Sequence, residues 1–230
     1  MTVILLILIL AVAYWYIVFG SAEAKAIRQR KHGKTPDEKK VIDYFLRHGL
    51  ARKLAGVMSD SDYITMVQTR ANSLNLRQKA IEQTGLDEDE ISEIKPINLV
   101  GYEFGKQSWA RRTDDDNQTV SSRYELTWIL FSESQMHMYK YSFDMDQNWH
   151  NTETEEFFYQ DVTSVSTATS SESARFVEKG GEREETVDTT QFRVIVPGDK
   201  MYFAMNGTDL STANESVKAM KQMLREKKNA

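Results

Sequence analysis

The chain begins with an uninterrupted apolar run. Residues 3–19, VILLILILAVAYWYIVF, contain no charged side chain. A helix over this run covers about 26 Å, close to the roughly 30 Å hydrocarbon layer of a bilayer. The pattern therefore predicts a transmembrane anchor over residues 1–20. The small residues Ala22 and Ala24 also fit a signal-peptide cleavage site, so removal of the run in the mature protein is the alternative.

Residues 36–95 show helical periodicity. Thr35 and Glu38 have the spacing of a capping box. Apolar residues then recur at helical intervals in two stretches, at Val41, Ile42, Phe45 and Leu46, and at Ile64, Val67, Ala71, Leu74 and Ile81. An acidic start and Pro96 indicate a further short helix over residues 86–96. We predict a small helical domain whose apolar faces form a core or, as the alternative, a groove for a partner.

From Ile97 onward, apolar and polar residues alternate with a period of two. Four stretches carry this alternation: YELTWILF (124–131), MHMYKYSF (136–143), EEFFYQDVTSVST (155–167) and QFRVIVPGDKMYFAM (191–205). The first two predict a hairpin, and the last predicts another hairpin that turns at Pro197 and Gly198. An amphipathic helix follows over residues 209–228. The fold class is therefore α+β, with a β-rich module over residues 97–230 that ends in a helix.

A resemblance to the pleckstrin-homology-like (PH-like) modules found in bacteria is carried by the stretches TWILFSESQMHMYKYSF, EEFFYQDVTSVST and FRVIVPGDKMYFAM and by the final helix. It covers residues 97–230 and rests on degenerate alternations of apolar and polar residues. It implies an antiparallel β-barrel or sandwich capped by the C-terminal helix, in a family that binds phosphoinositides, peptides or other proteins. Residues 141–174 depart from a phosphate-binding pattern, because they hold several carboxylates and no Lys or Arg. A protein or peptide partner of basic character is therefore expected.

Basic residues gather directly after the apolar run. Residues 21–40 hold seven Lys or Arg against three Asp or Glu, although the whole chain has a net charge of −5. By the positive-inside rule this flank stays in the cytoplasm, which places the N-terminus outside and the body at the cytoplasmic face of the cell membrane. Five residues of the basic juxtamembrane segment 21–35 are expected to contact anionic lipid headgroups: Lys25, Arg28, Arg30, Lys31 and Lys34. A pure topology signal is the alternative, and the acidic body argues against a nucleic-acid partner.

No pattern of catalytic or metal-binding residues stands out. The chain has no cysteine, and its four histidines are not spaced as pairs of metal ligands. It carries no phosphate-binding loop, nucleophile elbow or dinucleotide fingerprint. We therefore expect no cofactor, no metal and no enzymatic activity. Trp109 and Trp149 lie in polar surroundings, where they either contact a partner or pack against their own loops.

The leading hypothesis from the sequence is a single-pass membrane-anchored binding or scaffold protein that presents the PH-like module to a protein or peptide partner. Two other classes stay open. One is a structural component of an envelope, secretion or transfer machine, which would have its α+β domain outside the membrane. The other is an enzyme whose site has no recognisable motif, which would need a deep pocket with perturbed titratable groups.

Overall fold

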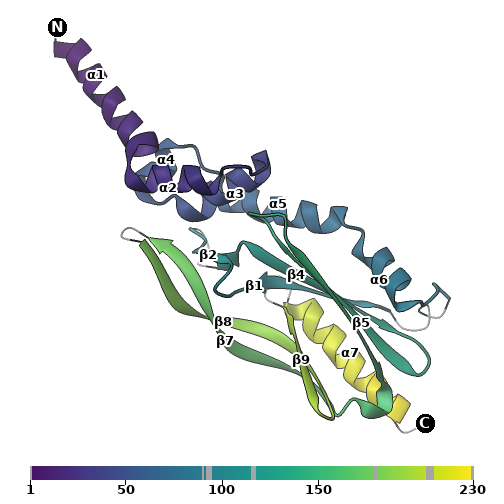
Figure 1. Ribbon diagram of the computed structural model, residues 1–230. Helices are drawn as coiled ribbons and strands as arrows, with labels where there is room; N and C mark the ends of the chain where they lie inside the picture. The colour runs from purple at the N-terminus through teal and green to yellow at the C-terminus, as the bar shows by residue number, and fades with distance from the viewer. Residues whose placement is uncertain are drawn as a thin grey trace.

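The computed structural model describes residues 2–89, 91, 95–114, 118–178, 181–205 and 210–228. It contains an N-terminal helical part and two β-sheets, which agrees with the expected α+β class. Figure 1 shows the first helix projecting from the body, with the N-terminus at its tip. The other N-terminal helices lie along one side of the sheets, and the C-terminal helix lies between the two sheets in this view (Figure 1).

The N-terminal helix α1 (Thr2–Trp15) continues into a π-helical turn, η1 (Tyr16–Gly20). The stretch Val3–Gly20 is long and apolar enough to cross a membrane by length and composition. Its side chains are almost all exposed, so the segment takes little part in the core. The expected N-terminal apolar helix is confirmed, whereas its retention and its orientation stay predictions.

Five helices follow the anchor: α2 (Ala22–Arg30), α3 (Pro36–Leu46), α4 (Gly49–Leu54), α5 (Asp60–Ser73) and α6 (Leu76–Thr84). The predicted capping box is present at the start of α3. The Thr35 N–H donates to Glu38 Oε2 at 2.7 Å, and the Glu38 N–H donates to Thr35 Oγ1 at 3.3 Å. The apolar stripe predicted for this helix is also confirmed, because Val41, Ile42, Phe45 and Leu46 are buried.

Two details of the helical prediction are corrected. The periodic pattern over residues 60–84 forms two helices, because Asn75 between them adopts a left-handed φ of 49°. The helix expected over residues 86–96 is absent from the described residues of that stretch, which form turns and irregular structure. Residues 90 and 92–94 lie outside the described residues.

The strands form two separate sheets. The first has the order β1 (Ile97–Glu103), β4 (Arg123–Phe131), β5 (Gln135–Asp144) and β6 (His150–Phe158), all antiparallel. The second has the order β3 (Thr119–Ser121), β2 (Trp109–Arg112), β7 (Ser164–Glu178), β8 (Gly181–Val196) and β9 (Asp199–Ala204). Its strands are antiparallel except for the parallel pair β2 and β7. The C-terminal helix α7 (Leu210–Lys228) follows.

Both predicted hairpins are confirmed. Leu126 of β4 lies opposite Tyr141 of β5, and β8 and β9 are joined at Pro197 and Gly198. The stretch 155–167 is not one strand, because a short 3₁₀ turn, η2 (Tyr159–Asp161), carries the chain from the first sheet to the second. The described strands close into no barrel, so the arrangement is an open two-sheet sandwich.

The first sheet is covered on both faces. On one face, Leu130 and Phe143 share a buried cluster with Tyr63 and Val67 of α5. The other face belongs to a second cluster made with the second sheet and α7, whose members include Ile129, Phe131, Met138, Phe192, Val194, Met220 and Leu224. The sequence left open whether the helices pack on the β-rich part, and the shared cluster shows that they do.

Candidate functional site

The C-terminal end of the apolar N-terminal helix is docked onto the body. Val18 of η1 is only 4% exposed, and its carbonyl oxygen accepts a hydrogen bond from Arg47 Nη1 at 3.3 Å. The next carbonyl, that of Phe19, accepts from Arg28 Nη2 at 3.3 Å. Ser21 then caps α2 by accepting from the Ala24 N–H at 3.1 Å. The anchor is therefore joined to the body by direct contacts and helix caps, which hold the body next to the end of the apolar helix.

Aromatic and apolar side chains remain exposed around this joint. Four aromatic residues at the end of the apolar run are exposed: Tyr14, Trp15, Tyr16 and Phe19. The short helix α4 contacts η1, and its Leu50 is 59% exposed. Tyrosine and tryptophan are enriched where membrane spans meet the headgroup layer. We call η1, α4 and the exposed side of α2 the anchor-base surface.

The five predicted lipid-contacting residues do not act as one group. Lys25 and Arg28 are exposed and line a shallow hollow with Trp15, Tyr16, Phe19 and Gly20 at the anchor-base surface. Arg30 instead pairs with Glu182 at 2.9 Å, and Lys31 pairs with Asp43. Lys34 is half-buried beside a groove described below. Lys25 and Arg28 are thus left beside the anchor, while Arg30 and Lys31 hold elements of the body together.

Trp109 is buried, so of the two predicted alternatives the packed one holds and the exposed partner contact is wrong. It is only 4% exposed, and two guanidinium groups lie close to its ring, those of Arg175 at 3.7 Å and Arg30 at 4.8 Å from the ring centroid. Glu182 pairs with both arginines, with N···O distances of 2.9 Å to Arg30 and 3.7 Å to Arg175. This stack ties α2 to the end of the β7–β8 hairpin, which reaches toward α2 in Figure 1.

Trp149 is half-buried and packs against its own neighbourhood on one side. The guanidinium group of Arg123 lies 3.9 Å from the centre of its ring. Arg123 also binds both carboxylate oxygens of the fully buried Asp144, at 2.6 and 3.1 Å. Of the two predicted tryptophans, neither is therefore a free exposed ring. Trp109 is fully packed inside the protein, and Trp149 is packed on one side.

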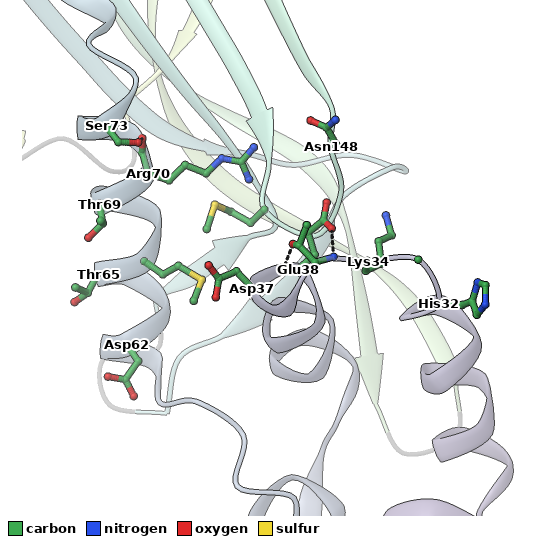
Figure 2. Close-up of a pocket in the computed structure, with 14 residues that line it drawn as sticks. His32, Lys34, Asp37, Glu38, Asp62, Thr65, Thr69, Arg70, Ser73 and Asn148 are labelled. Carbon is green, nitrogen blue, oxygen red and sulfur yellow. Dashed lines mark hydrogen bonds between the residues drawn. The ribbon is translucent and has the colours of Figure 1, made fainter.

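A groove lies between α3, α5 and the connection from β5 to β6. It has a volume of about 1000 Å³, and Met66 and Met145 contribute to its lining together with polar residues. Figure 2 shows Arg70 extending from α5 and the capping-box bonds around Glu38 at the start of α3. Arg70 is already used by the fold, because its Nη1 donates to the Asp144 carbonyl at 2.9 Å and its guanidinium covers the Phe143 ring.

The side chains that line the groove suit the binding of a ligand better than the catalysis of a reaction. Its charged lining is mixed, with Lys34 and Arg70 beside Asp37 and Asp62. Asp37 and Asp62 are exposed, and Oδ2 of Asp62 accepts hydrogen bonds from the N–H and the hydroxyl of Ser59 in a second capping box. Within the described ranges, no group of three or more His, Asp or Glu is placed to hold a metal ion. The groove could accommodate a polar chain with small apolar groups.

Exposed acidic residues of the β-rich part lie on β8, among them Glu182, Glu184 and Asp188, and on β6, at the edge of the first sheet. Glu153, Glu155 and Glu156 are exposed on this strand. The sequence indicated an acidic surface here, because Lys and Arg are missing from residues 141–174, but it did not indicate a sheet edge. A comparison with family models, with curated proteins and with solved structures found no match for this chain.

Proposed function

We propose that this chain is a single-pass membrane-anchored binding protein, which presents a PH-like module to a protein or peptide partner at the cytoplasmic face of the cell membrane. One observation carries the proposal: an exposed apolar helix long enough to span a bilayer is docked on the body through Val18 and Arg47. A docked anchor keeps the body near the membrane, where a partner on the same membrane meets it at a raised effective concentration.

The order of elements supports the PH-like part of the proposal. One antiparallel sheet, β1, β4, β5 and β6, is followed by the antiparallel strands β7, β8 and β9 and then by α7. Met220 and Leu224 of α7 are buried between the two sheets. Two sheets with a C-terminal helix packed against both support the PH-like part of the proposal. The strands β2 and β3, which extend the second sheet beside β7, are additions to that plan.

Charge supports a protein partner over a phosphorylated lipid. The exposed carboxylates of β6 would repel phosphate groups and attract lysine or arginine side chains. Among the basic residues near the anchor, Lys25 and Arg28 lie where lipid headgroups would be. The membrane contact and the partner contact are therefore proposed for different surfaces.

The orientation is tested with single cysteines, since the native chain has none. Ser134→Cys and Ser171→Cys place the thiol at exposed positions of two different hairpins. We expect a membrane-impermeant thiol reagent to leave both variants unlabelled in intact cells and to label them after lysis. Labelling in intact cells would place the body outside and favour the envelope-machine alternative. Release of the protein from alkali-washed membranes would show that the apolar run is cleaved.

Contact of α4 with the bilayer gives a further prediction. Leu50 is exposed beside η1, so we expect it to lie at the level of the lipid headgroups. A fluorophore on Leu50→Cys in reconstituted vesicles should be quenched several-fold more strongly by headgroup-level spin-labelled lipid than the same fluorophore on Ser134→Cys. Equal quenching at the two positions would contradict the placement of α4 at the membrane.

A further inference from the structure

β6 forms an edge of the first sheet, and the outer side of this strand pairs with no other strand in the described part of the chain. β6 is the last strand of this sheet, and β5 is its only strand neighbour in the described part of the chain. Residues of an antiparallel strand direct their N–H and C=O groups to alternate sides. About half of the backbone groups of β6 therefore face away from β5. Every residue of β6 except Phe157 is exposed. Neither face of this strand is therefore covered, whereas the faces of β4 and β5 are covered.

The other sheet edges are less available. β1, at the opposite edge of the first sheet, contacts β9, which forms an edge of the second sheet. The remaining edge, β3, has three residues, of which Val120 and Ser121 are buried. β6 has nine residues, which is enough for a typical strand pairing. Two inner strands also leave part of one side open, because β2 pairs with β7 only at Arg175 and Phe176 and β9 pairs with β8 only over residues 191–196. Among the outermost strands, β6 is the one whose whole length is open.

The charges of β6 select the kind of strand that could pair with it. Glu153 and Glu155 project to the same face, and Glu156 projects to the other face. Glu153 pairs with Lys140, and Glu156 lies 3.6 Å from His137 Nδ1, yet both glutamates are 48% exposed. Side chains directly opposite each other on neighbouring strands interact, and opposite charges stabilise the pair. An incoming strand with Lys or Arg at alternate positions would match this pattern.

An apolar contact lies at the end of the same strand. Phe158 is 48% exposed, and outside the anchor only Leu50 and Tyr202 are comparable among the large apolar residues of the described chain. Phe158 projects to the same face as Glu156. A strand that pairs with β6 could cover this ring with an apolar side chain, because aromatic rings stabilise cross-strand pairs.

We propose that β6 is a strand-addition site, at which an extended basic segment of a partner protein pairs with the edge of the first sheet. The backbone of the partner hydrogen-bonds to β6, its basic side chains face Glu153 and Glu155 on one face of the sheet, and an apolar side chain on the other face covers Phe158. This inference rests on the proposed function for the class of partner and adds the surface and the mode of binding.

The test uses the full chain in lipid nanodiscs and a defined probe peptide of about ten residues that alternates lysine and valine, matching the length of β6. We expect saturable binding with protection of β6 amides from hydrogen exchange. A lysine–proline peptide has the same charge but cannot form a strand, and it should bind at least tenfold more weakly. Equal binding of the two peptides would overturn strand addition, as would no binding of the lysine–valine peptide at millimolar concentration.

Charge-reversal variants locate the site. Glu153→Lys/Glu155→Lys should weaken binding of the lysine–valine peptide at least tenfold, and Phe158→Ala should weaken it several-fold. The matched control is Glu184→Lys/Asp188→Lys, which makes the same charge change at exposed positions of β8 and should leave binding within about twofold. Equal losses from both double variants would mean that net charge alone attracts the peptide.

The outcomes separate this inference from the proposed function. Charged residues on sheet edges also protect proteins from unwanted pairing, and in that case the β6 variants would leave peptide binding unchanged. Such a result would overturn the strand-addition site and leave the anchored, cytoplasmic body intact as a proposal. Labelling of Ser134→Cys in intact cells would instead overturn the proposed location without changing how β6 pairs with a peptide.

Discussion

Replacement of Asp60 by alanine is expected to lower the free energy of unfolding by about 3–5 kcal/mol. Asp60 begins α5 and is 7% exposed. One of its oxygens accepts from Tyr44 Oη at 2.8 Å, and the other accepts from the Asp114 N–H at 2.6 Å. Arg52 and Arg111 approach the first oxygen at 3.4 and 3.5 Å. Removal of the carboxylate would leave two largely buried guanidinium groups without this counter-charge.

The ionisation of Asp60 explains why the effect is large at neutral pH. Burial opposes the charged form, but the hydrogen bonds from Asp114 and Tyr44 and the charges of Arg111 and Arg52 hold the pKa of this carboxyl below its usual value of 3.8. A lowered folded-state pKa stabilises the protein above the unfolded-state value. The contribution is lost as the pH falls through the folded-state pKa. At pH 7 it is fully present.

Thermal unfolding of the full chain in mild detergent checks this prediction. For a chain of this size, 3–5 kcal/mol corresponds to a fall in Tm of about 6–20 °C. Asp37→Ala is the matched control, because Asp37 also lies in the first turn of a helix but is exposed and pairs only with Lys40. It should change Tm far less, as is usual for exposed ion pairs. Equal shifts in the two variants would contradict the role assigned to Asp60.

Glu125→Gln is expected to stabilise the protein at pH 8 by about 2–3 kcal/mol and to have little effect at pH 4. Glu125 lies on β4 with 6% of its surface exposed, and its Oε1 accepts a hydrogen bond from the Ala204 N–H at 2.8 Å. Burial raises the pKa of this carboxyl to about 7, while the Ala204 N–H and Lys140 act in the opposite direction. Glutamine keeps the acceptor oxygen and carries no charge.

The sign of the pH dependence follows from the direction of the shift. The carboxyl binds its proton more tightly in the folded chain than in the unfolded chain, where its pKa is 4.5. Between pH 4.5 and about 7 the folded wild type therefore loses stability relative to the glutamine variant as the pH rises, and above that range the difference is constant. Melting curves of both proteins from pH 4 to pH 8 measure this difference. A difference that does not change with pH would show that Glu125 ionises normally.

Much of the secondary structure was predictable because it depends on neighbours in the sequence. The apolar run over residues 3–19, the capping box at Thr35 and the β4–β5 hairpin each arise from residues a few positions apart. The break at Asn75 and the switch between sheets at Tyr159–Asp161 were missed. At both places the apolar pattern continues across the break, so periodicity alone does not reveal it.

The candidate sites were less predictable because distant contacts decide them. The sequence left open whether Trp109 contacts a partner or packs against its own loop, and the structure packs it against Arg30 and Arg175 from positions far away in the chain. The same contact removes Arg30 from the expected lipid-binding group. β6 resembles any other polar strand until the order of the sheet places it at an edge.

By itself, the sequence determined the apolar N-terminal helix, the α+β class and the position of most helices and strands. Hydrophobic periodicity and helix caps reveal these elements, because they depend on residues within one or two helical turns or one hairpin. The tertiary structure alone decided which charges are free. Lys25, Arg28 and Glu155 stay exposed, whereas Arg30, Lys31, Glu153 and Asp60 each pair with a residue of another element. A charge becomes available to a lipid or a partner only where folding brings no counter-charge to cover it, and that depends on residues far apart in the chain.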